Sequence, residues 1–88
     1  MVNWQLIYTR QAQKDVKKAV STGLHIKIKT LLAIIEKNPF MNPPSYEKLS
    51  GDMEGAYSRR INIQHRLVYQ VFEEEKIIKI LRMWTHYE

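Results

Sequence analysis

Hydrophobic residues in the first half of the chain recur with the period of a helix. A short apolar run at residues 4–8 is typical of a strand, and two stripes then repeat at intervals of three and four residues. The first stripe consists of Ala12, Val16, Ala19 and Val20, and the second of Leu24, Ile28, Leu31, Leu32 and Ile35. The pattern predicts a strand followed by two amphipathic helices.

Polar residues and breakers between these segments predict where the helices begin and end. The hydroxyl of Thr9 can accept from a backbone N–H left open in the first turn, so we expect it to cap the first helix. Gly23 suits the left-handed position past a helix end. Asn38 precedes Pro39 and is therefore pushed out of the α region, which ends the second helix. The two helices should run antiparallel across a tight turn.

The second half of the chain changes to strand patterns. Residues 57–63, 67–72 and 77–84 read as three strands joined by short connections, and residues 46–49 as a short edge strand after a proline-containing loop. Within the first of these, Tyr57, Ile61 and Ile63 share one parity and should face one side. We therefore predict an α+β fold, in which two N-terminal antiparallel helices pack on a twisted, mainly antiparallel sheet of four to five strands. The sheet face without helices would be open to carry chemistry.

Length and composition narrow the class of protein. The 88 residues fit one domain, spanning 1–88, and 44% hydrophobic with 26% charged residues is typical of a globular chain. Without cysteine there is neither a disulfide framework nor a thiolate zinc site. The N-terminus lacks a signal-peptide pattern, and the longest apolar run, residues 31–35, is too short to span a bilayer. We expect a soluble, cytoplasmic protein with no membrane partner.

The positive charge is concentrated in the first half. Residues 1–38 hold seven Lys and Arg against two acids, a charge of +5, whereas residues 39–88 hold seven of each sign. Such a bias suits a surface that faces a polyanion. A lysine-rich, solvated helix exterior explains the same residues equally well.

The candidate chemistry lies near the ends of the predicted strands. Glu47, the arginines Arg60 and Arg66, and His86 supply a carboxylate, guanidiniums and an imidazole. Metal-free RNA cleavage needs these groups, to take a proton from a ribose 2′-hydroxyl, to hold the phosphate and to protonate the leaving oxygen. Strand alternation would also gather Arg82 with Arg60, Arg66 and His86 on one side. Alternatively, Arg60 and Arg82 form surface ion pairs with residues 73–75 or 54.

Other kinds of site have weaker support. A metal site from Glu47, His65 and His86 is conceivable, but no ligand spacing favours it. The chain has no glycine-rich phosphate loop and no nucleophile elbow. We therefore expect no metal and no cofactor.

Several stretches together resemble the YoeB/Txe branch of the RelE toxin superfamily. The resemblance covers nearly the whole chain and is carried by Glu47-x-Leu49, Gly55-x-x-Ser58-Arg59-Arg60-Ile61, His65-Arg66-Leu67-Val68-Tyr69 and the terminal Thr85-His86-Tyr87. It implies a RelE-like fold and a toxin of a bacterial toxin–antitoxin pair. Such toxins enter the A site of the 70S ribosome and cut mRNA there without metal.

The resemblance also implies roles for matched residues. Glu47 corresponds to the general base, Arg66 to the residue that holds the scissile phosphate, and His86 to the general acid. Arg60 matches a second phosphate contact and Tyr87 a base contact. The product would be a 2′,3′-cyclic phosphate.

Two further residues, Lys48 and Arg59, are expected to contact substrate.

Two positions depart from the family pattern. The family usually follows its glutamate with proline, leucine and a basic residue, whereas here Lys48 precedes Leu49. In a strand this shift reverses the face of the basic side chain. The chain also continues to Glu88, one residue past the tyrosine.

The leading hypothesis is thus a ribosome-dependent mRNA endonuclease that inhibits translation. The resemblance implies a cognate, acidic, YefM-like antitoxin as partner, and a homodimer is possible within the family. Two alternatives stay open. One is a non-catalytic inhibitor that binds RNA or the ribosome, and the other is a co-repressor that binds operator DNA with its antitoxin.

Overall fold

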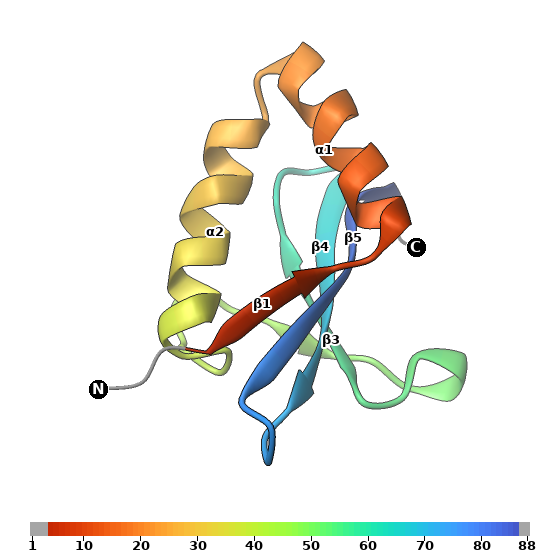
Figure 1. Ribbon diagram of the computed structural model, residues 1–88. Coiled ribbons are helices and arrows are strands. Elements are labelled where there is room, and N and C mark those ends of the chain that lie inside the picture. The colour runs from red at the N-terminus through yellow and green to blue at the C-terminus, as the bar shows by residue number, and fades with distance from the viewer. Residues whose placement is uncertain (1–3, 87–88) are drawn as a thin grey trace.

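Two helices lie on one face of a five-stranded sheet in the computed structural model (Figure 1). The structure describes residues 4–86, and their side chains as far as Met83. The elements are β1 (Gln5–Tyr8), α1 (Arg10–Thr22), α2 (His25–Lys37), β2 (Glu47–Lys48), a short 3₁₀ turn (Gly51–Met53), β3 (Ala56–Arg60), β4 (His65–Phe72) and β5 (Ile77–His86). The predicted α+β fold is confirmed.

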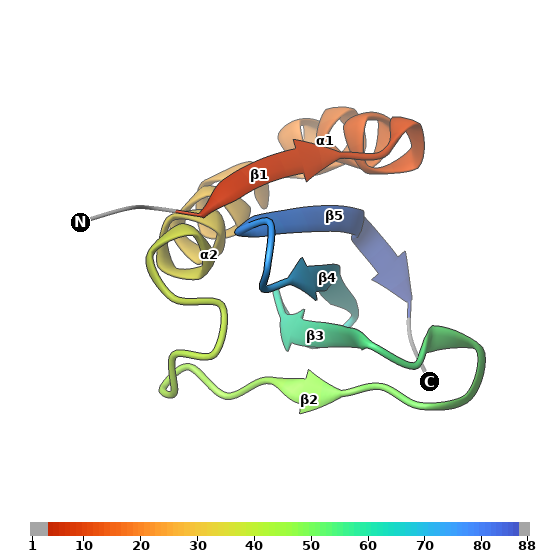
Figure 2. The same ribbon diagram turned by 60° about the horizontal axis from the view of Figure 1, so that its bottom comes forward.

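The strands do not follow one another in chain order across the sheet. Their order is β1-β5-β4-β3-β2, so the first strand lies beside the last. β1 runs parallel to β5, and every other neighbouring pair is antiparallel. β2 forms the edge farthest from β1 (Figure 2). The helices α1 and α2 connect β1 to the rest of the sheet.

The helix boundaries follow the predicted signals. The Thr9 hydroxyl accepts from the backbone N–H of Ala12 at 3.0 Å and so caps α1. Gly23 ends the helix with φ of +81°, a conformation that glycine adopts without steric cost. α2 ends before Asn38, which is extended. The predictions at all three positions are confirmed.

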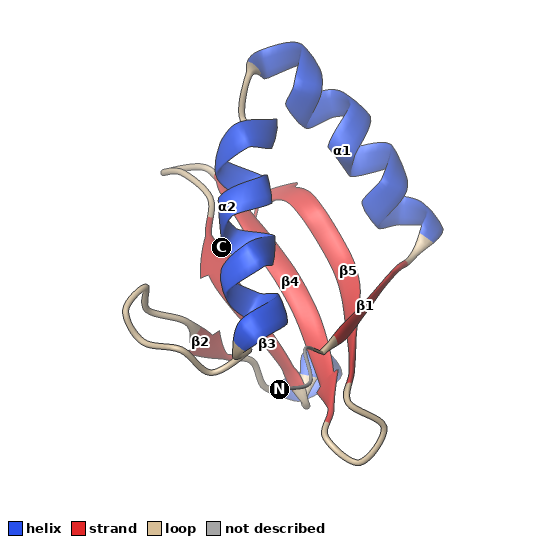
Figure 3. Ribbon diagram, turned by 60° about the vertical axis from the view of Figure 1, so that its left-hand side comes forward, coloured by secondary structure: helices blue, strands red, loops and turns tan. Residues whose placement is uncertain are grey.

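The core lies between the helices and the sheet. In the view of Figure 3 α2 passes in front of the strands, and α1 lies on the β5 side of the sheet, where it contacts β5. The buried hydrophobic cluster contains Ala12 and Ala19 from α1 and Ile28, Leu31 and Ile35 from α2, packed on Ile61, Leu67, Tyr69, Ile78, Ile80 and Met83. Because successive residues of a strand face opposite sides, the residues between these strand positions point to the other face.

One predicted strand is shorter than expected. Residues 57–63 were predicted to form a single strand, but β3 ends at Arg60. The side-chain oxygen of Asn62 accepts from the backbone N–H groups of Gln64 and His65, which bends the chain into a turn. Ile61 stays in the core, but Ile63 is 89% exposed, so the prediction that both face one side of a single strand is wrong.

Candidate functional site

The register of β2, β3 and β4 gathers polar residues on the sheet face opposite the helices. Glu47 pairs with Ser58, and Arg60 pairs with Arg66. Residues directly opposite in antiparallel strands share a face, as do residues two apart in one strand. Leu67, the neighbour of Arg66, belongs to the core under the helices. These four polar side chains therefore lie together on the open face.

Arg66 and Glu47 are in direct contact there. The Arg66 Nη1 donates to Glu47 Oε1 at 2.6 Å and to the hydroxyl of Ser58 at 3.3 Å. The side chain of Glu47 is 66% exposed and that of Arg66 is 21% exposed, so solvent reaches both. The structure thus brings together two of the three residues for which catalytic roles were expected.

A pocket surrounds this ion pair. Its volume is about 350 Å³, and it is lined by Ser45, Tyr46, Glu47, Ser58, Arg60 and Arg66. A pocket of this size can hold a small ligand. Two guanidiniums match the geometry and charge of a phosphate, and the carboxylate beside them is a proton acceptor. The arrangement can bind a phosphodiester and remove a proton from a group next to it.

The backbone of β5 brings His86 to the neighbouring position. His86 pairs with His65, and Thr85 pairs with Arg66. The third expected catalytic residue therefore lies, by its backbone, one register position from Arg66. Its side chain, and the whole of Tyr87 and Glu88, lie outside the described part of the structure.

Lys48 does not line the pocket with Glu47. It pairs with Tyr57 in β3, and as the next residue in the strand it faces the opposite side. The reversed facing that the sequence indicated is therefore present.

The structure corrects the role that was expected for Arg59. It was predicted to contact substrate, but it is 1% exposed. Its guanidinium donates to the hydroxyl of Tyr69 at 3.1 Å and to the carbonyls of Pro39, Met41 and Pro44 at 2.6–3.0 Å. These acceptors leave no surface for an RNA ligand, so we exclude Arg59 from the candidate site.

Arg59 instead organises the loop that leads to Glu47. The carbonyls it binds belong to the segment between α2 and β2, and its guanidinium lies 5.0 Å from the centre of the Tyr46 ring. A buried guanidinium needs this many partners to offset its lost hydration. The sequence held a clue, because Arg59 has the parity of Tyr57 and Ile61, whose side chains face the core side.

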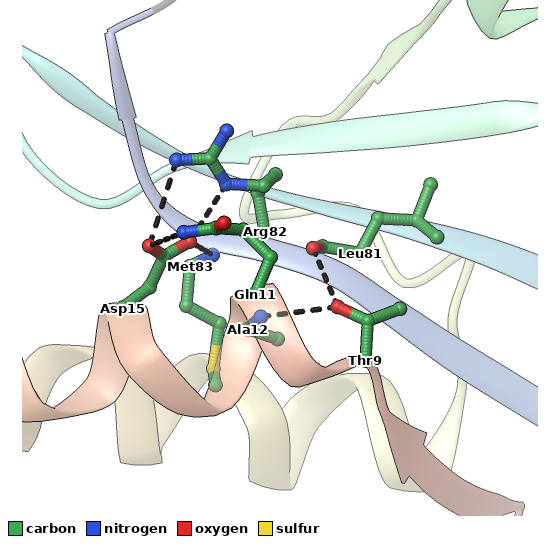
Figure 4. Close-up of polar contacts among 7 residues, drawn as sticks. All are labelled: Thr9, Gln11, Ala12, Asp15, Leu81, Arg82 and Met83. Atoms are coloured by element: carbon green, nitrogen blue, oxygen red, sulfur yellow. Dashed lines mark hydrogen bonds and ion pairs between the residues drawn. The ribbon is translucent and has the colours of Figure 1, made fainter.

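Arg82 is the second correction, because it does not join Arg60 and Arg66. Its Nε donates to Asp15 Oδ2 of α1 at 2.8 Å, as Figure 4 shows. The alternative expectation, ion pairs with residues 73–75 or 54, named the wrong acid. Asp15 lies midway between Ala12 and Ala19 in the buried stripe of α1, a position that could have pointed to it.

The environment of Asp15 keeps it charged. Burial by itself raises the pKa of this carboxyl, but hydrogen bonds from Arg82, from the Met83 backbone N–H and from Gln11, together with the charge of Arg82, outweigh that effect. The pKa of Asp15 is therefore lowered below its ordinary value.

The described part of the chain contains neither a candidate metal cluster nor a helix that could span a membrane. No group of three or more histidine or acidic side chains gathers closely enough there to hold a metal ion. No helix within residues 4–86 is long and apolar enough to cross a membrane.

Comparison with known proteins agrees with this fold. The family model of the YoeB-like toxin of bacterial type II toxin–antitoxin systems matches residues 6–87. The chain belongs to this family. Toxin YoeB of Streptomyces coelicolor is 40% identical over 52 residues, which make up 59% of this chain and 62% of that protein.

Solved structures show the same architecture. The YoeB/ParE toxin from Agrobacterium tumefaciens superposes with a TM-score of 0.86 at 30% identity, over 94% of this chain and 99% of that one. YoeB from Staphylococcus aureus, in a heterotetrameric complex with YefM, superposes with a TM-score of 0.79 at 36% identity, over 96% and 98%. The S. aureus toxin has also been solved as a dimer.

Proposed function

We propose that this toxin is an endoribonuclease, an mRNA interferase, that cuts mRNA in the A site of the 70S ribosome without a metal ion. The observation that carries the proposal is the contact between Glu47 and Arg66 in an open pocket that Arg60 also lines. Membership of the YoeB-like toxin family supports it. Inhibition of translation follows from loss of the message.

The reaction begins at the ribose next to the scissile phosphate. Glu47 takes the proton of the 2′-hydroxyl, and the 2′-oxygen attacks the phosphorus. The bond to the 5′-oxygen breaks, and His86 gives that oxygen a proton. The products are a 2′,3′-cyclic phosphate and a 5′-hydroxyl. Each proton transfer supplies roughly 10²–10⁴-fold in rate.

The arginines act on the phosphate. Arg66 and Arg60 stabilise the negative charge that grows on the phosphate oxygens as the 2′-oxygen attacks. Without RNA, Glu47 occupies one donor of Arg66. An arriving phosphate competes for that donor, so substrate binding frees the carboxylate for its role as base. Tyr87 completes the proposed substrate contacts, whereas Lys48 lies on the opposite side of its strand from Glu47.

The helices supply a second contact area. All seven basic residues of the first half lie on α1 or α2, and all are exposed: Arg10, Lys14, Lys17, Lys18, Lys27, Lys29 and Lys37. We propose that this helix surface binds ribosomal RNA through phosphate contacts. The same surface would serve a toxin that blocks the ribosome without cutting, which is the second candidate.

The partner is proposed from the relatives and from charge. The S. aureus YoeB assembles with YefM, and this chain carries a net charge of +5. An acidic YefM-like antitoxin would complement that charge and stabilise the toxin by mass action. A self-associated form, like the S. aureus dimer, is a further possibility, and a cytoplasmic location would follow from the ribosomal target.

Substitution of Glu47 tests whether this residue is the general base of the proposed nuclease. The Glu47→Gln variant keeps the size of the side chain but not its basicity, so cleavage of ribosome-bound mRNA should slow by roughly 10²–10⁴-fold. Glu54→Gln changes another exposed carboxylate, in the loop before β3, and should cut at the wild-type rate. Primer extension on purified ribosomes measures both.

The substrate provides an independent check. A message with one 2′-deoxyribose at the scissile nucleotide should stay intact, because it lacks the attacking oxygen. Cutting of that message, or wild-type cutting by Glu47→Gln, would show the mechanism to be wrong. Inhibition without any cutting would favour the non-catalytic blocker.

A further inference from the structure

The pairing between β4 and β5 shifts twice near the candidate site. Tyr69 pairs with Ile80, Val68 with Arg82, and the next recorded pair towards the site joins Arg66 to Thr85. Residues 65–69 of β4 therefore lie opposite residues 80–86 of β5, five positions against seven. Each shift adds one residue to β5, which is the definition of a β-bulge.

These two bulges decide where His86 lies. If the register of Tyr69 and Ile80 continued unbroken, Trp84 would pair with His65 and His86 would lie two residues farther along. Two residues of strand correspond to about 6.6 Å. The bulges remove this offset and place the backbone of His86 opposite His65.

Side chains of the α1 segment hold the bulged backbone of β5. The Met83 N–H donates to Asp15 Oδ2 at 3.1 Å, and the carbonyl of Leu81 accepts from the Thr9 hydroxyl at 2.9 Å (Figure 4). A bulge disrupts the regular ladder of hydrogen bonds, and buried backbone groups need other partners there. Thr9, the N-cap of α1, and Asp15, inside the helix, supply such partners.

The position of Asp15 favours this role over that of an ordinary ion pair. Its side chain is fully buried, and its two oxygens also receive Arg82 at 2.8 Å and Gln11 at 3.1 Å. A buried carboxylate is costly unless several donors surround it. Here one of those donors is the backbone N–H of Met83, inside the stretch of β5 where the second shift falls, so the carboxylate is tied to the geometry of that strand.

We infer that Asp15, with Thr9, is a positioning residue. It fixes the register of β5 and so places the backbone of His86 beside the site. Asp15 does not touch the RNA; it acts through the backbone of residues 81–83. The link to catalysis rests on the proposed function, whereas the effect on register does not.

The register is measured first, without reference to activity. In the wild-type protein, cross-strand NOEs between amide and α protons should join His65 to His86 and Arg66 to Thr85. In Asp15→Ala these should weaken, with new NOEs from Arg66 to Met83, the unbulged pairing. Unchanged His65–His86 pairing in Asp15→Ala overturns the inference, whatever the activity. If Asp15→Ala does not fold, Asp15→Asn and Thr9→Val are measured in the same way.

Activity is measured second, against a control for stability. Asp15→Ala should lower kcat for mRNA cleavage on the order of 100-fold, because a misplaced proton donor is costly, and leave the KM for programmed ribosomes unchanged. Leu31→Ala empties a buried site in α2 and leaves the hydrogen bonds from Thr9 and Asp15 to β5 in place. At matched folded fractions it should keep the wild-type kcat.

The outcomes separate the two proposals. A slipped register with wild-type kcat would overturn the link to His86, as would an equal fall of kcat in Leu31→Ala. If the wild-type toxin cuts no RNA, the proposed function fails, and the NOE pattern alone still supports or overturns the role of Asp15 in the register.

Discussion

Single residues in this protein are used in ways that their charge alone does not reveal. Arg59 and Arg66 both belong to the basic stretch between residues 58 and 66, yet one is buried beneath a loop and the other lines the open pocket. The difference is one of strand parity, because alternate residues face opposite sides of the sheet. A count of basic residues therefore overstates the surface available to a phosphate.

At the scale of single residues, the lowered pKa of Asp15 predicts that the stability of the fold depends on pH. Its pKa in the folded protein is below the ordinary 3.8, so the unfolded chain takes up the proton at a higher pH than the folded one. The stabilisation by Asp15 is then fully present above about pH 5 and is lost as the pH falls below about 4. Urea unfolding of wild type and Asp15→Asn at several pH values measures this difference.

The difference between the two proteins should be largest near neutral pH and should shrink on acidification. Comparison with Asp15→Asn cancels the other carboxyl groups, which titrate in both proteins. A difference that stays constant from pH 7 to pH 3 would mean that the charge of Asp15 contributes nothing to folding.

Elements are joined here by polar side chains at their ends. The loop between α2 and β2 has no regular structure, and its carbonyls are held by Arg59. The Tyr69 hydroxyl accepts from Arg59 and donates to the Pro39 carbonyl at 2.8 Å. Burial raises the pKa of Tyr69, so it stays protonated and keeps its donor. The position of Glu47 thus depends on contacts that Arg59 and Tyr69 make with the loop before it.

Removal of one hydroxyl tests this connection. Tyr69→Phe leaves the buried Nε of Arg59 without its acceptor and removes one of the two donors to the Pro39 carbonyl, which should lower the free energy of unfolding by about 1–3 kcal/mol. Chymotrypsin should then cut the loop faster at Phe40 and Tyr46. The control is Tyr8→Phe, at a tyrosine that is 41% exposed on β1. Equal stability and equal proteolysis of the two variants would show that the Tyr69 hydroxyl does not hold the loop.

At the scale of the whole molecule, the candidate site and the excess positive charge lie on different surfaces. The pocket lies on the open face of the sheet, whereas the excess positive charge lies on the two helices. A ribosome-bound toxin would need both, one to react with mRNA and the other to hold the large anionic RNA around it. Lys14 and Lys17 lie one turn apart on α1, both exposed.

Salt dependence tests the helix surface as a whole. The double variant Lys14→Gln with Lys17→Gln should weaken binding to 70S ribosomes and reduce the slope of log K against log salt by about 2, one for each lost phosphate contact. Fluorescence anisotropy with labelled toxin measures this slope. Lys76→Gln, in the turn before β5, should leave it unchanged. An unchanged slope in the double variant would remove these lysines from the interface.

The sequence by itself determined the elements and named two residues that the structure brings together in the candidate site. Helical and alternating periods placed both helices and the main strands, because those periods follow from local backbone geometry. Glu47 and Arg66 were identified from residue type and family resemblance, and the register brings them together.

Only the tertiary structure decided the rest. The parallel pairing of β1 with β5, the burial of Arg59 and the partner of Arg82 join residues distant in the chain, which local periods do not encode. The bulges of β5 could not be predicted from the sequence either, since they depend on a donor and an acceptor supplied by Thr9 and Asp15. The position of His86 is therefore set by contacts made about seventy residues earlier in the chain, at Thr9 and Asp15.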